Sequence, residues 1–194
     1  MLDRITKRVA DEILATVPGM TEERAEQIDY GLYMAISDSL KLAAVILTAL
    51  LLGKINYALV AVLVFSINKS LFGGVHAKSQ IGCILTHFTL IFGTIYLSIL
   101  VSIPYLNYIL FTISGFLIYF YAPADLESKP IITEKRYKEL KIKGRLVFAS
   151  WFLVSLFIPL TYCNIVSIIT FITSVNLTPL VYKITKNRKG GVLT

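Results

Sequence analysis

Apolar stretches alternate with short polar connections along most of the chain. The clearest stretches are residues 81–103, 105–121, 146–162 and 165–182. Each is close to the length of about 20 residues that a helix needs to cross a bilayer. Pro104 ends the first stretch, and Cys163-Asn164 separates the last two. The pattern therefore predicts that each stretch forms a membrane-spanning helix.

Residues 42–67 form an apolar stretch that is too long for one span. As a single helix they would extend for about 39 Å, whereas the hydrocarbon core of a bilayer is about 30 Å thick. Such a helix would also place Lys54 near the bilayer centre, at a cost of roughly 3 kcal/mol. We therefore predict two helices, residues 33–52 and 57–69, joined by a turn at residues 53–56. The second is short enough to stop inside the membrane or to thin it locally.

Residues 1–17 have the pattern of an amphipathic helix. The apolar residues recur at helical spacing: Leu2, Ile5, Val9 and Ile13. Pro18-Gly19 ends this helix, and Thr21 begins another as an N-cap that acidic residues follow. The first helix either lies on the membrane or packs as a soluble arm on the protein itself, and the sequence favours neither.

Composition and charge indicate an integral membrane protein. Of the residues, 56% are hydrophobic and 16% are charged, whereas a soluble domain is about a quarter charged. With six spans, both termini and residues 69–78 and 125–145 share one side, together with 18 of the 19 Lys and Arg residues. The positive-inside rule makes that side cytoplasmic, whereas five spans would scatter these charges. The net charge of +7 thus reflects loops that face anionic lipid, and no nucleic acid partner is expected.

We expect one all-α domain over residues 1–194, a polytopic membrane bundle of about six transmembrane helices. In this interpretation residues 1–32 form the amphipathic arm at the cytoplasmic surface. Residues 33–182 form the transmembrane core, and residues 183–194 form a basic cytoplasmic tail.

The residues that can carry chemistry cluster in the first cytoplasmic connection. His76 lies seven residues before Cys83. A thiolate with a nearby imidazole is the minimum equipment of a cysteine nucleophile. On one continuous helix the two Cα atoms would be about 10.5 Å apart, which makes a poor catalytic pair. Gly73-Gly74 before His76 therefore predicts a loop, with a new helix that begins within residues 77–81.

Other residues near this loop are candidates for binding a substrate or stabilising an oxyanion. They are Lys69, Gly73, Gly74, Lys78, Ser79 and Gln80. The lysines can attract an acidic peptide, and hydroxyl, amide or backbone N–H groups can donate to an oxyanion. His87, four residues after Cys83, is either a rival base or a helix-packing residue.

The residues alone leave plainer interpretations open. Cys83 also fits an inert buried residue, and His76 fits a polar residue of a cytoplasmic loop. Cys163 is expected to be a packing or an interfacial residue. A metal site made by the two histidines and Cys83 is not expected, because these residues would span about 16 Å on one helix. No cofactor is expected.

Two motifs resemble the accessory gene regulator B (AgrB) family. The first is Phe72-Gly73-Gly74-Val75-His76-Ala77 with Cys83, and the second is Tyr121-Ala122-Pro123-Ala124-Asp125-Leu126-Glu127-Ser128-Lys129-Pro130. The likeness extends to size and hydrophobic layout over essentially the whole chain. The family often has Arg where this chain has Lys69, which keeps the positive charge without the bidentate fork.

The resemblance implies a multi-pass membrane cysteine endopeptidase of a Gram-positive bacterium, which processes the precursor of a cyclic autoinducing peptide in quorum sensing. It implies His76 and Cys83 as the catalytic pair, which would form a thioester that an internal Cys or Ser of the peptide resolves into a ring. The expected partners are this pro-peptide and membrane lipid, and a homodimer is left open. The alternative functions are a small permease or exporter component and a non-catalytic membrane scaffold.

Overall fold

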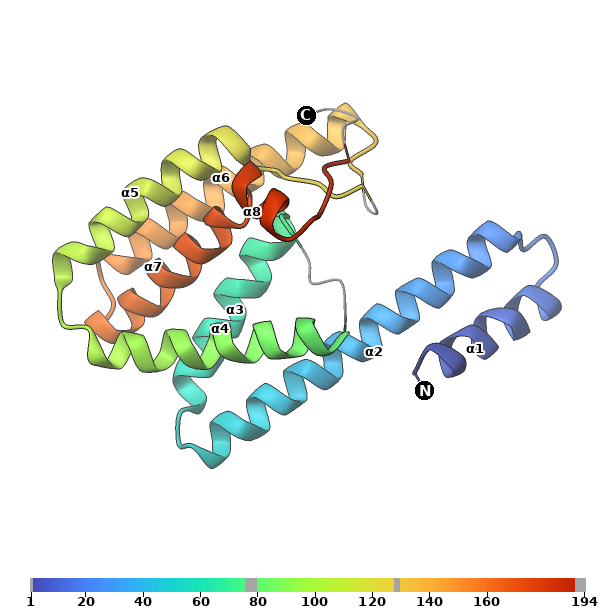
Figure 1. The fold of residues 1–194 in the computed structure, drawn as a ribbon, viewed down its shortest axis with the longest axis horizontal. Helices are drawn as coiled ribbons and strands as arrows, with labels where there is room; N and C mark the ends of the chain where they lie inside the picture. The colour runs from blue at the N-terminus through green and yellow to red at the C-terminus, as the bar shows by residue number, and fades with distance from the viewer. Residues whose placement is uncertain (1, 76–79, 128–129, 191–194) are drawn as a thin grey trace. The chain divides into compact units, whose positions relative to one another are not determined.

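A computed structural model describes residues 2–75, 80–127 and 130–190 of the chain (Figure 1). Over these residues the fold is all-helical, with eight helices and no strand element, which confirms the predicted fold class. The chain divides into two compact units, Met1–Leu51 and Leu52–Thr194.

The first unit is a pair of helices, α1 (Leu2–Thr16) and α2 (Glu22–Leu51). As predicted, Thr21 caps α2, because its Oγ1 accepts the backbone N–H of Arg24 at 3.3 Å. α1 packs against α2, while Ile5 on α1 stays 49% exposed. The arrangement fits both expectations for α1, an arm that packs on the protein and a helix with an apolar face for lipid.

α2 is one continuous helix of 30 residues, about 45 Å long. The predicted division between an arm that ends at residue 32 and a span that begins at residue 33 falls inside this helix. The predicted end of the span is confirmed, since α2 stops at Leu51 and a turn with Gly53 follows.

The second unit begins with α3 (Ile55–Phe72), α4 (Gln80–Leu100) and α5 (Pro104–Tyr121). The predicted division of residues 42–67 into two helices is confirmed by the turn before α3. α3 is longer than expected, because its 18 residues extend for about 27 Å, close to the thickness of the hydrocarbon core. The bounds predicted for α4 and α5 are correct to within three residues.

The last helices are α6 (Glu134–Ser155), α7 (Leu160–Val175) and α8 (Pro179–Ile184). α6 begins inside the predicted polar connection of residues 125–145, which is a correction. Its first turns carry ion pairs at helical spacing, such as the one between Lys138 and Glu134, whose atoms are 2.7 Å apart. Such pairs stabilise a helix that has no apolar face to bury.

The predicted break between the last two spans is wrong. The chain turns at residues 156–159, and Cys163 lies inside α7. A second break precedes Pro179, inside the predicted span of residues 165–182. A proline stands at the start of the next helix in both places, where its fixed φ fits and its missing N–H is not needed.

Three helices of the described residues are long and apolar enough to span a membrane, namely α2, α3 and α4. α5 and α7 are shorter apolar helices. These findings support a membrane protein, and the arrangement with six spans stays a prediction.

α7 is the central helix of the second unit (Figure 1). It packs against α3, α4, α5 and α6, and its buried residues include the polar Asn164, Ser167 and Thr170. Asn164 was expected in a connection, but other segments satisfy its side chain: Nδ2 donates to the carbonyl oxygens of Ser98 at 3.0 Å and Val101 at 2.8 Å. A buried amide with such partners stabilises a helix bundle instead of interrupting it.

Asn68 joins α3 to α6 and α7. Its side chain is fully buried, and Nδ2 lies 3.3 Å from Oγ1 of Thr170 and 3.2 Å from Oγ1 of Thr173. Its Oδ1 accepts the indole N–H of Trp151 at 2.9 Å. The last turns of α3 are therefore held against two other helices.

Asn68→Leu should lower the free energy of unfolding by about 1–3 kcal/mol, because the buried indole N–H of Trp151 loses its acceptor. Asn56→Leu is the matched control, since Asn56 is an exposed residue of the same helix. Unfolding of the purified protein in mixed detergent measures both changes. Equal losses in the two variants would contradict the role of Asn68.

Candidate functional site

The two motifs singled out in the sequence meet in space. α3 ends at Phe72, and residues 73–75, the Gly-Gly segment, continue in non-helical backbone. The carbonyl oxygen of Phe72 accepts the N–H of Ala124 at 2.8 Å, and the N–H of Gly74 donates to the carbonyl of Ala124 at 2.9 Å. These bonds form a parallel bridge between Gly73 and Ala124. The stretch after α5 thus holds the Gly-Gly segment from one side.

The connection between α7 and α8 holds the Gly-Gly segment from another side, because the N–H of Val75 donates to the carbonyl of Asn176 at 3.5 Å. Gly73 and Gly74 have φ of 77° and 89°. A Cβ on Gly73 would collide with the carbonyl oxygen of Ala124, and one on Gly74 would lie 2.9 Å from that of Asn176. Glycine is needed at both positions, because the backbones approach too closely for a side chain.

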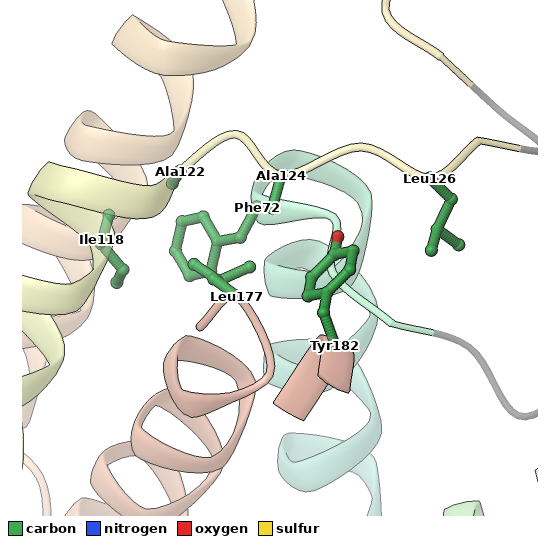
Figure 2. Packing of buried hydrophobic residues seen from close by; sticks show 7 residues of the cluster. All are labelled: Phe72, Ile118, Ala122, Ala124, Leu126, Leu177 and Tyr182. Carbon is green, nitrogen blue, oxygen red and sulfur yellow. The ribbon is translucent and has the colours of Figure 1, made fainter. Parts of the chain in front are cut away.

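An apolar cluster packs at this junction (Figure 2). Its buried members are Phe72, Ile118, Ala122, Ala124, Leu126, Leu177 and Tyr182. Figure 2 shows the Phe72 ring directed toward Ile118 and Leu177, and Tyr182 rising from α8 toward the stretch after α5. The Tyr182 hydroxyl donates to the backbone carbonyl of Asp125 at 2.7 Å. The ends of α3, α5 and α7 are thereby packed together around the Gly-Gly segment.

Cys83 lies in the first turn of α4, which begins at Gln80. The prediction that a new helix begins within residues 77–81 is therefore confirmed. The side chain of Cys83 is half-buried. The free N–H groups and the positive end of the helix dipole at a helix N-terminus favour a thiolate over a thiol.

Lys69 brings a positive charge to the same place. It lies in the last turn of α3, and its Nζ donates to the carbonyl of Val75 at 2.6 Å. The side chain of Lys69 also lies within electrostatic range of Cys83. One side chain therefore binds the Gly-Gly segment and interacts with Cys83.

The structure brings together four of the predicted site residues, namely Lys69, Gly73, Gly74 and Cys83. His76, Lys78 and Ser79 lie outside the described residues, as does the side chain of Gln80. The sequence alone connects Val75 to His76, the next residue in the chain.

The ring of His87 packs edge-on against the ring of Phe65 on α3, with the two centroids 5.0 Å apart. Edge-on aromatic contacts of this kind stabilise helix packing. The contact supports the interpretation of His87 as a packing residue.

Cys163 is 8% exposed. Of the two expected roles, packing or interfacial, this burial supports packing. Cys163 lies in the first turn of α7, whereas the Gly-Gly segment contacts Asn176, about 20 Å further along the helix axis. A pocket of about 270 Å³ beside Cys163 is therefore separate from the site around Cys83.

Two residues that the sequence did not predict take part in this junction: Asn176 supports the Gly-Gly segment, and Tyr182 supports the stretch after α5. Asn176 acts through a backbone carbonyl, which no side-chain pattern reveals. Pro179 was the available signal, because a proline inside an apolar stretch marks a helix boundary there.

A comparison with known protein families identifies the family of this chain. The family model described as accessory gene regulator B matches residues 3–178. The chain belongs to the AgrB family. The resemblance drawn from the two motifs is confirmed, and this membrane protein is a member of a quorum-sensing family.

Relatives of the AgrB family agree. A protein of Clostridium perfringens that is named for its likeness to AgrB is 27% identical over 157 residues, which cover 75% of this chain and 71% of the relative. A similarly named protein of Listeria monocytogenes is 26% identical over 192 residues, which cover 95% of this chain and 92% of the relative. No solved structure matches this chain.

Gly73→Ala should disrupt the junction between the two AgrB motifs, because its Cβ collides with the Ala124 carbonyl. Gly53→Ala is the control: Gly53 also has a positive φ, 63°, but a Cβ there would meet nothing within 4 Å. Gly53→Ala should cost roughly 1–2 kcal/mol of unfolding free energy from backbone strain alone. Gly73→Ala should cost roughly 1–3 kcal/mol more, from two lost hydrogen bonds. Equal losses in detergent unfolding would argue against the junction.

Proposed function

We propose that this AgrB family member is a membrane-embedded cysteine endopeptidase that removes the C-terminal tail of a quorum-sensing pro-peptide. One observation carries the proposal: Cys83 lies in the first turn of α4, within electrostatic range of Lys69, whose side chain is bonded to the Gly-Gly segment. His76 follows this segment directly in the sequence. The AgrB resemblance implies the same pair of catalytic residues.

In the proposed reaction the Cys83 thiolate attacks the carbonyl carbon of one peptide bond in the precursor. His76 takes the thiol proton and delivers it to the departing nitrogen, so the C-terminal tail leaves with a new amino group. The rest of the peptide stays on Cys83 as a thioester. An internal Cys or Ser of the peptide then attacks the thioester, and its proton returns to the Cys83 sulfur. The product is a cyclic thiolactone or lactone, and the balance needs no oxidant.

Ring closure must be faster than hydrolysis of the thioester. Two groups held on one bound peptide react as if at a concentration of up to roughly 10⁵ M or more when they are well aligned. The buried apolar cluster at the Gly-Gly segment supports a site from which water is kept away. Cyclisation is therefore the favoured outcome when the peptide carries an internal nucleophile.

The proposal places the site, both termini and residues 125–145 on the cytoplasmic side of a Gram-positive cell membrane. The distribution of Lys and Arg supports this orientation. Cysteines introduced at positions 135 and 188 should resist an impermeant thiol reagent in intact cells and react after lysis. Ready labelling of either position in intact cells would contradict the orientation.

Cys83→Ala should abolish precursor cleavage, because the nucleophile is lost, whereas Cys163→Ala should keep most of it. The assay uses the full chain reconstituted in membranes and a pro-peptide with an internal Cys and an acidic C-terminal tail. Cleavage is followed by mass spectrometry. Equal loss in both cysteine variants would indicate a structural effect and would count against the proposed nucleophile.

The same assay separates the two histidines. His76→Ala should slow cleavage by about 10²–10⁴-fold, which is the usual contribution of general acid–base catalysis. His87→Ala removes a ring that packs on Phe65 and should have a much smaller effect. If only the change at His87 removes activity, the base is assigned to the wrong histidine.

A further inference from the structure

The buried carboxyl group of Asp125 binds one segment that is near in the chain and one that is distant. Asp125 is 5% exposed. Its Oδ1 accepts the N–H of Gly190 at 3.1 Å, and its Oδ2 accepts the N–H of Ile131 at 3.2 Å. Hydrogen bonds from backbone N–H groups to a carboxylate are stronger than those between neutral groups. Asp125 thus fixes both the stretch that follows it and the end of the described chain.

Residues 185–190, the C-terminal tail of the described chain, dock through further contacts. The N–H of Glu127 donates to the carbonyl of Arg188 at 3.0 Å. The ammonium group of Lys189 lies 6.0 Å from the ring centroid of Tyr121 and 5.8 Å from that of Tyr182. Cations at this distance are attracted to aromatic faces. The tail therefore has a defined binding place, in addition to the basic charge noted in its sequence.

Gly190 is the point at which the tail comes closest. A Cβ at this position would collide with Oδ2 of Asp125 and would lie 3.0 Å from Cα of Pro130. A residue without a side chain is needed for the backbone N–H to reach the carboxyl group. The docking is thus sensitive to a single added methyl group.

The docked tail and the candidate site hold the same short stretch of chain. Ala124, the neighbour of Asp125, makes both backbone bonds to Phe72 and Gly74. The Gly-Gly segment held in this way supplies the carbonyl of Val75 that binds Lys69. A shift of Asp125 would therefore displace Ala124, which is bonded directly to the Gly-Gly segment.

We infer that Asp125 is a positioning residue: by binding the C-terminal tail it holds Ala124 against the Gly-Gly segment and so sets the reactivity of Cys83. The inference rests on the proposed function, in which groups on and next to this segment activate the thiol. It assigns to residues 185–190 of this chain a role in the reaction, in addition to any contact with lipid.

The test measures the reactivity of Cys83 directly and needs no precursor. Cys163→Ala leaves a single thiol, since the chain has two cysteines. The full chain in membrane vesicles is alkylated with iodoacetamide across the pH range in which thiols ionise, and thermal stability is measured in parallel. His76→Ala in the same background provides the profile of a thiol without its base.

Asp125→Asn keeps the shape and one acceptor oxygen but places an NH₂ group against one of the two backbone N–H donors. Gly190→Ala pushes the tail away while leaving Asp125 unchanged. Gly93→Ala is the matched control, since a Cβ at that position would meet nothing within 4 Å. Asp125→Asn and Gly190→Ala should slow alkylation at neutral pH by roughly tenfold and move the profile toward that of His76→Ala. The control should leave it unchanged.

The inference is overturned if Gly190→Ala keeps the original profile. It is also overturned if both variants lose thermal stability while their profiles stay unchanged, because Asp125 would then be structural only. If Asp125→Asn does not accumulate in membranes, Gly190→Ala decides alone. An unchanged alkylation profile in His76→Ala would instead contradict the proposed catalytic pair. The Asp125 and Gly190 variants would still test the inference, because Lys69 also connects the Gly-Gly segment to Cys83.

Discussion

The parallel backbone pairing between Gly73 and Ala124 is the contact on which the candidate site depends. A buried backbone N–H or carbonyl group without a partner costs free energy comparable to a lost hydrogen bond, so a chain that leaves a helix inside a packed junction needs partners within the protein. Ala124 and Asn176 supply them for residues 72–75. Because these contacts exclude side chains at Gly73 and Gly74, the most distinctive pair of glycines in the sequence has a direct physical cause.

Buried amides meet a similar constraint inside the helices. Asn68 binds groups on α6 and α7. Asn164 binds the carbonyl of Ser98 on α4 and that of Val101, which lies just after the end of α4. Apolar contacts alone fix the rotation of a membrane helix weakly, whereas directional hydrogen bonds select one rotation. Asn68 precedes Lys69 directly in the chain. The hydrogen bonds of Asn68 that orient the end of α3 therefore also orient Lys69.

A thiolate is expensive to form in apolar surroundings unless opposite charge or hydrogen-bond donors lie close to it. Among the described residues, Cys83 lies in the first turn of α4 and within electrostatic range of Lys69. Lys69 stands where arginine is frequent in the family, and its ammonium group has N–H donors in addition to the one that binds the carbonyl of Val75.

The sequence by itself determined the helical class and the approximate positions of the first five helices. These follow from local properties: apolar length and the breaks that proline and glycine make. The pairing of His76 with Cys83 stays a prediction, because His76 lies outside the described residues. The sequence misplaced the last two spans and did not predict α8, because a polar Asn164 and the charged residues 125–145 are typical of connections when the sequence is considered alone. Only the tertiary structure decided that Ala124 and Asn176 hold the Gly-Gly segment, and that Asp125 binds residues 131 and 190. Their bonds are made largely by backbone groups from segments far apart in the chain, and such groups are the same in every residue.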